Sequence, residues 1–224
     1  MMTPAAFTNL AAFEYADVLW TGLLMTLQIS LIGMAGSVVV GLAGAAAITL
    51  RVPVLSQAIR MYVEIIRNTP LLVQVFFLFF VAPPLGLTLS AYAVGCISLI
   101  AWGGAYNVEN FRAGLDAVGP RYQEGARALG FSRFRTFVHV TAPIGVRLSI
   151  PGLTNTLISV LKNSALMLGI GLAELTFVVQ KLSADTFRTV ELYVLLGVVY
   201  LVLVLLLSSF MHLIGRRYAL AGGV

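Results

Sequence analysis

The sequence predicts an all-α membrane protein with about five transmembrane helices. The first observation is composition: 59% of the 224 residues are hydrophobic, 10% are charged, and the mean hydropathy is +0.97. Soluble domains are about 25% charged, so this chain has too few charged side chains to cover a globule with a wetted surface. The second observation is a series of long charge-free runs. Together they exclude a soluble enzyme and a disordered chain.

The charge-free runs give the positions of the expected spans, since a membrane-crossing helix needs about 20 mostly apolar residues. The run that follows Asp17 ends at Arg51 and holds one long span. The run 68–108 is interrupted by Pro83-Pro84-Leu85-Gly86, a strong turn signal, and is expected to form a helical hairpin. We expect one transmembrane domain over residues 1–224, with spans at about 20–50, 69–84, 88–109, 149–171 and 192–215.

The basic residues predict the orientation of these spans. Eleven of the 14 Lys and Arg residues fall on one side of the expected topology, namely Arg51, Arg60, Arg67, Arg112, Arg121, Arg127, Arg133, Arg135, Arg147, Arg216 and Arg217. The positive-inside rule assigns this side to the cytoplasm, with the N-terminus outside and the C-terminus cytoplasmic. The formal charge of +5 therefore indicates orientation in a bilayer, and we expect no nucleic-acid partner.

The segment 111–148 is polar, basic and too long for a structureless connection. Residues 122–129 predict a short amphipathic helix that starts near Pro120 and ends before Gly130 in a left-handed cap. Ser132 is expected to cap a second short helix that runs to about Val138 and is closed by Pro143. Two short helices that meet at a glycine suit docking to a partner. The alternative is a helix pair resting on anionic headgroups.

The spacing within this segment resembles the EAA loop of ABC importer permeases. Glu124-Gly125-Ala126 is followed after three residues by Gly130, and after nine more by Val140-Thr141-Ala142-Pro143. The usual motif has Ala, Ile and Leu where this chain has Gly125, Val140 and Ala142. Further segments resemble the polar amino-acid importers of the histidine/glutamine/arginine type: 62–74, Glu109 with Arg112-x-Gly114, 151–155, 161–164 and Glu174-Leu175.

This resemblance implies a type I ABC importer permease in a bacterial cytoplasmic (inner) membrane. By the resemblance, the ATPase-coupling residues are Glu124, Gly125, Ala126, Gly130, Ser132 and Pro143. The implied partners are a cytoplasmic ABC ATPase dimer, a second identical or homologous permease, an extracytoplasmic solute-binding protein and a polar amino-acid substrate. The chain has no G-x-x-x-x-G-K-[ST] loop, so ATP hydrolysis is assigned to the partner.

Polar residues in the fourth expected span are candidates for the substrate path. Asn155, Ser159 and Lys162 share one helical face, Asn163 and Ser164 follow directly, and Thr69 and Gln74 are weaker candidates on the second span. An ionised Lys162 within a span is expected to face a cavity or a partner. Its alternatives are a structural bond to carbonyl groups and snorkelling to the interface. Glu174 is 12 positions beyond Lys162, about 18 Å along a straight helix, so the two can pair only if the helix breaks.

No catalytic residues, metal site or cofactor are expected. The sequence has neither a G-x-S-x-G nor an H-E-x-x-H motif, and its histidines, His139 and His212, have no paired carboxylate. Two other functions remain open at this point. One is an ABC permease for another small solute, and the other is a channel or secondary carrier that does not use ATP.

Overall fold

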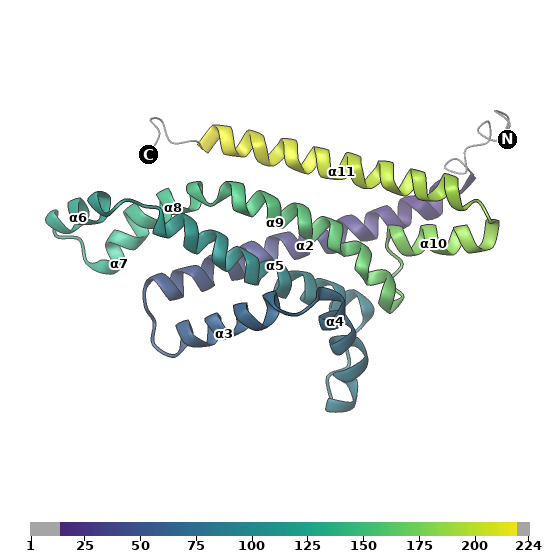
Figure 1. The fold of residues 1–224 in the computed structure, drawn as a ribbon, viewed down its shortest axis with the longest axis horizontal. Helices are drawn as coiled ribbons and strands as arrows, with labels where there is room; N and C mark the ends of the chain where they lie inside the picture. The colour runs from purple at the N-terminus through teal and green to yellow at the C-terminus, as the bar shows by residue number, and fades with distance from the viewer. Residues whose placement is uncertain (1–13, 219–224) are drawn as a thin grey trace.

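The computed structural model describes residues 14–218, and all regular structure in this range is helical (Figure 1). The long helices run side by side along the molecule: α2 (Ala16–Thr49), α5 (Ala91–Asp116), α9 (Ile150–Asn163) with a 3₁₀ extension over Ser164–Ile170, and α11 (Thr189–Tyr218). These four are long and apolar enough to cross a membrane, and in the described residues the number rises to five if one bent helix pair forms a single span. The predicted all-α membrane fold is confirmed.

Glycines bring α2 and α5 into close contact. A Cβ atom on Gly33 would lie 2.8 Å from the Leu99 Cβ, and one on Gly44 would lie 2.6 Å from a Val108 methyl group. Contacts this short leave no space for a side chain, so these glycines serve helix packing. The α2–α5 pair is the centre of the bundle.

The bent pair consists of α3 (Leu55–Arg67) and α4 (Leu71–Phe76), which continues as a π-helical turn over Phe77–Val81. The chain bends by 106° between the two limbs. Thr69 precedes Pro70, which disfavours helical backbone there, and Pro70 itself is extended. The Gln74 side chain donates to the Ile66 carbonyl and the Thr69 hydroxyl at 2.9 and 2.8 Å and holds the bend.

The expected span 69–84 coincides with the second limb of this pair alone. The search for charge-free runs could not find α3, because Arg60, Glu64 and Arg67 lie between the run that ends at Arg51 and the run that begins at residue 68. Arg60 and Arg67 lie on α3, which packs against α5. Helix α5 also extends past residue 109 to Asp116, into the segment expected to begin at 111.

The sequence analysis did not predict a short helix, α10 (Leu175–Thr186), which follows α9 and precedes α11 along the chain. Gly171 ends the preceding 3₁₀ turn with φ of 74°. Glu174 then caps α10, accepting hydrogen bonds from the backbone N–H groups of Thr176 and Phe177 at 2.9 and 2.7 Å. Apolar side chains of α2, α10 and α11 pack around it, among them Leu19, Val178, Val179 and Leu192.

Candidate functional site

Two short helices form a hairpin at one end of the molecule (Figure 1): α6 (Pro120–Ala128) and α7 (Arg133–Thr136). Gly130 has φ of 80°; its N–H donates to the Arg127 carbonyl and the Phe131 N–H to the Ala126 carbonyl. This is a Schellman motif, which requires a left-handed residue at the glycine position. The Ser132 hydroxyl accepts a hydrogen bond from the Arg135 N–H and caps α7. The predicted glycine conformation and serine cap are confirmed.

The helix after Ser132 does not end at Pro143, and that prediction is wrong. A π-helical turn over Phe137–Thr141 follows α7 and leads into α8 (Ala142–Leu148), in which Pro143 is the second residue. The chain therefore passes from the hairpin into α8 and on to α9, with Ser149 donating to the Gly145 carbonyl at the junction.

The hairpin exposes two large apolar side chains among its basic residues. Leu129 is 80% exposed and Phe134 is 63% exposed. Of the predicted coupling residues, Ala126 is buried, whereas Glu124, Gly125, Gly130, Ser132 and Pro143 are exposed. A Cβ atom on Gly125 or Gly130 would have no neighbour within 4 Å. Sequence reasoning missed Leu129 and Phe134 as candidate contacts; large apolar residues in a short basic hairpin were the available signal.

The hairpin is joined to the helical bundle at two points. The Arg133 guanidinium donates to the Thr49 carbonyl at the end of α2, at 3.0 Å. In α8, Gly145 packs against Leu115 of α5. A displacement of the hairpin would therefore reach α2, α5 and α9 directly.

The predicted polar face of α9 is present, with Asn155 and Lys162 exposed and Ser159 half-buried. Ser159 donates to the Asn155 carbonyl, and the buried Ser164 donates to the Leu161 carbonyl, so both hydroxyls bond within α9. Asn163 is half-buried. Thr69 and Gln74 bond to each other at the α3–α4 bend, and among the described residues no hydrogen bond joins them to the α9 group.

Lys162 does not pair with Glu174. Glu174 is fully buried, and its carboxylate also accepts hydrogen bonds from the hydroxyls of Thr26 and Tyr200, at 3.4 and 3.2 Å. It therefore joins α2, α10 and α11 rather than α9. Lys162 forms no ion pair with any residue from 14 to 218.

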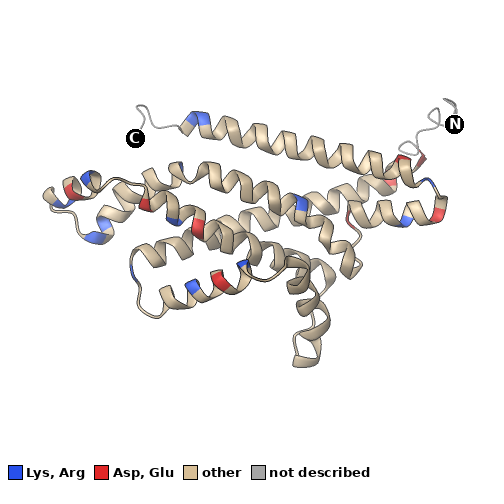
Figure 2. Cartoon of the chain, viewed as in Figure 1, with Lys and Arg blue, Asp and Glu red and all other residues tan. Residues whose placement is uncertain are grey.

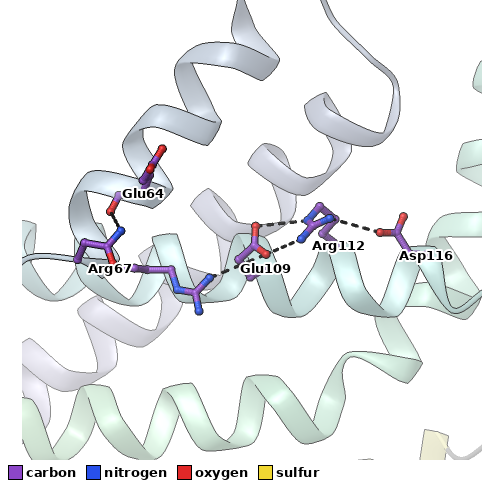
Figure 3. Close-up of polar contacts among 6 residues, drawn as sticks. Glu64, Arg67, Glu109, Arg112 and Asp116 are labelled. Atoms are coloured by element: carbon purple, nitrogen blue, oxygen red, sulfur yellow. Dashed lines mark hydrogen bonds and ion pairs between the residues drawn. The ribbon is translucent and has the colours of Figure 1, made fainter.

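Charged residues on α3 and α5 form a network that sequence reasoning did not assemble (Figure 3). Glu109 accepts from Arg112 at 2.6 Å, with Arg67 at 3.9 Å on its other side, and Arg112 also lies 3.7 Å from Asp116. Arg67 stacks 5.1 Å from the Tyr106 ring centroid. A cavity of about 550 Å³ opens beside the network, lined by Arg60, Val63, Glu64, Arg67, Asn68, Tyr106 and Glu109.

The charged lining of this cavity consists of two guanidinium groups, Arg60 and Arg67, and two carboxylates, Glu64 and Glu109. The spacing of Arg60, Glu64 and Arg67 at i, i+4 and i+7 was the sequence signal for this face.

Comparison with known proteins identifies the class of protein. Residues 37–220 match the family described as "Binding-protein-dependent transport system inner membrane component". The chain is 33% identical over 209 residues to the glutamine transport system permease protein GlnP of Escherichia coli (strain K12), which covers 92% of this chain and 95% of that protein. It is 31% identical over 210 residues to the L-cystine transport system permease protein TcyB of Bacillus subtilis (strain 168), covering 93% and 90%.

Comparison with solved structures gives the same class of protein. A chain from "Crystal structure of an amino acid ABC transporter with histidines" superposes with a TM-score of 0.87 at 30% identity, over 97% of this chain and all of that one. A chain of the MetNI methionine ABC transporter in an inward-facing conformation shares the fold, with a TM-score of 0.78 at 18% identity, over 98% of this chain. The fold is thus that of a type I ABC importer permease. The chain belongs to the family of binding-protein-dependent transport system inner membrane components, among the amino-acid ABC permeases.

Proposed function

We propose that this chain is the membrane subunit of an ATP-driven importer of polar amino acids, in which it forms the translocation path and couples to a separate ATPase. The observation that carries the proposal is the α6–Gly130–α7 hairpin, which exposes Leu129 and Phe134 and is joined to the bundle through Arg133 and Gly145. The polar amino-acid substrate is supported by the glutamine and L-cystine permeases among its relatives.

The distribution of charge supports the proposed orientation. Lys and Arg gather at the end of the molecule that carries α6, α7 and the last turn of α11, whereas the opposite end holds a mixture of both signs (Figure 2). By the positive-inside rule, the hairpin and the C-terminus face the cytoplasm and the N-terminus faces outward. The proposed spans are α2, the bent pair α3–α4, α5, α9 and α11, in an inner membrane.

The assembly we propose contains two permeases, identical or homologous, two ATPases bound at the hairpins, and an extracytoplasmic solute-binding protein. Glu124, Gly125, Ala126, Gly130, Ser132 and Pro143 shape the ATPase contact, and Leu129 and Phe134 supply its apolar centre. In the path, Lys162 with Asn155, Ser159, Asn163 and Ser164 forms one polar wall. Thr69 and Gln74 act by holding the bend of α3–α4.

The test is purification of the tagged full-length chain from its native membrane in mild detergent, with mass spectrometry of the proteins that accompany it. Leu129→Lys is expected to abolish recovery of an ATPase subunit without unfolding the chain, because the Leu129 side chain is 80% exposed. Phe187→Lys is the matched control, since Phe187 is 89% exposed and lies after α10, at the opposite end of the molecule. Equal recovery of an ATPase with both variants would contradict the hairpin assignment.

A transport measurement then separates an importer from a carrier. Reconstituted with its partners, the wild-type complex is expected to accumulate amino acid only when ATP is supplied. Uptake by the chain alone, without ATP, would overturn the proposal in favour of a channel or secondary carrier.

A further inference from the structure

A second cavity lies between the hairpin and the bundle and has a strong excess of positive charge. It has a volume of about 510 Å³ and is bounded by the end of α2, by α3 and α5, and by α6 and the π-helical turn after α7. Its charged lining consists of five guanidinium groups and one carboxylate: Arg51, Arg60, Arg112, Arg127, Arg133 and Asp116.

The single carboxylate does not balance this charge. Asp116 pairs with Arg112, whose guanidinium is also held by Glu109. The other four arginines form no ion pair with any residue in the described part of the chain. Four unpaired guanidiniums around one cavity repel each other, and an anion placed among them would relieve that repulsion.

Two hydroxyl groups give independent support for a ligand. Thr136 lines the cavity, is 4% exposed, and its hydroxyl has no hydrogen-bond partner among the described residues. The hydroxyl of Thr49, another lining residue, is likewise buried and without a partner in the described part of the chain. Buried hydroxyl groups are normally hydrogen-bonded, and a vacant pair on one cavity points to an acceptor that binds there.

We propose that this cavity binds an anionic phosphate group. A phosphate offers more charge and more acceptor oxygens than one carboxylate, and guanidinium groups bind it through paired N–H donors. The two available sources are the headgroup of an acidic phospholipid and free inorganic phosphate. We favour the headgroup, because basic pockets between helices on the cytoplasmic side bind acidic lipid headgroups and the proposed orientation puts this cavity on that side. The bound phosphate would fix the hairpin to α2 and α3, with Arg51 and Arg60 on one side and Arg127 on the other.

The experiment is native mass spectrometry of the delipidated full-length chain, titrated separately with dioleoyl phosphatidylglycerol, dioleoyl phosphatidylcholine and inorganic phosphate. We expect one phosphatidylglycerol to bind at least about tenfold more tightly than phosphatidylcholine, whose choline group the arginines repel. Saturable binding of inorganic phosphate with the same arginine dependence would also support the site and would assign free phosphate as its source. Binding of neither anion would overturn the proposal.

Variants identify the cavity as the place of binding. Arg51→Gln with Arg60→Gln is expected to weaken phosphatidylglycerol binding about tenfold or more. The matched control is Arg216→Gln with Arg217→Gln, which removes the same charge at the end of α11, outside the cavity. Equal loss in both double variants would show charge-driven surface binding and overturn the site.

Thr136→Val provides a readout that does not depend on net charge. It removes a hydroxyl that lacks a partner in the protein, so the fold should be retained. We expect about threefold weaker binding or more. Unchanged binding would contradict the assignment of Thr136 as a donor to phosphate. Because these assays measure neither transport nor ATPase recovery, their failure would leave the importer proposal untouched.

Discussion

Gly145 of α8 packs against the backbone of Leu115 in α5, where a Cβ atom on the glycine would lie 2.8 Å from the Leu115 Cα. Backbone atoms cannot move aside as a flexible side chain can, so this contact fixes the distance between the two helices. Since α8 leads directly into α9, the contact joins the hairpin segment to two of the long helices. Force applied to the hairpin by a partner would be passed on as a movement of α5 and α9 together.

Gly145→Ala is therefore expected to destabilise the chain by about 1–3 kcal/mol through overpacking. The measurement is thermal unfolding of the detergent-purified chain. Gly125→Ala is the matched control, because a Cβ atom there meets nothing within 4 Å and alanine favours the helix. Its unfolding temperature should equal or slightly exceed that of the wild type. A Gly145→Ala variant as stable as the control would contradict the proposed contact.

The effect of substituting Gly130 on the hairpin should depend on backbone conformation rather than on side-chain volume. The glycine has φ of 80° and open space around it. Valine is strained at this φ by about 1–2 kcal/mol, whereas asparagine tolerates it. Gly130→Val is expected to increase amide hydrogen exchange in residues 126–135, with Gly130→Asn close to wild type. Equal exchange in both variants would mean that the left-handed turn is not required.

Glu174→Ala is expected to cost about 3 kcal/mol, because it removes the α10 cap and leaves the Thr26 and Tyr200 hydroxyls without their acceptor. Thermal unfolding again provides the measurement, with the exposed Asp185→Ala as control.

A double-mutant cycle tests whether Lys162 and Glu174 interact. Combining Lys162→Met with Glu174→Gln should give a coupling energy below about 0.5 kcal/mol, as for residues that share no contact. A larger coupling would mean that the two charges meet in the folded chain.

Glu109→Gln should lower stability by about 1 kcal/mol at low salt, because Glu109 faces both Arg67 and Arg112 while remaining partly exposed. The difference from wild type should shrink in about 1 M NaCl, which screens these pairs. Asp116→Asn is the control: the Asp116 side chain is 64% exposed and its carboxylate lies 3.7 Å from Arg112, so a change within about 0.5 kcal/mol is expected. A salt-independent loss for Glu109→Gln would exclude an electrostatic cause.

The sequence predicted those features that depend on local chemistry. The left-handed Gly130, the Ser132 cap and the turn at Pro83–Gly86 follow from the backbone preferences of single residues, and each is present. The all-helical membrane fold followed from composition and run length. The family followed from the spacing of Glu124, Gly130 and Pro143.

Features that depend on tertiary contacts could not be predicted in the same way. Helix α3 was not found by counting charge-free residues, because this count takes no account of partners for its charges, such as Glu109 for Arg67. Helix α10 was missed because its cap, Glu174, is buried against residues far away in the sequence. The phosphate cavity needs Arg51, Arg127 and Thr136 in one place, and no periodicity relates them.

Helices α2 and α11 are both long and apolar, yet they are packed in opposite ways. Twelve residues of α2 are buried, four of them glycines, whereas in α11 only Leu192 and Met211 are buried. The sequence of α11 should therefore vary more than that of α2. One aliphatic residue can replace another along most of α11, whereas in α2 even a methyl group is excluded at Gly33 and Gly44. Mutational tolerance in this protein would then follow helix contact, and hydrophobicity alone would be a poor guide to it.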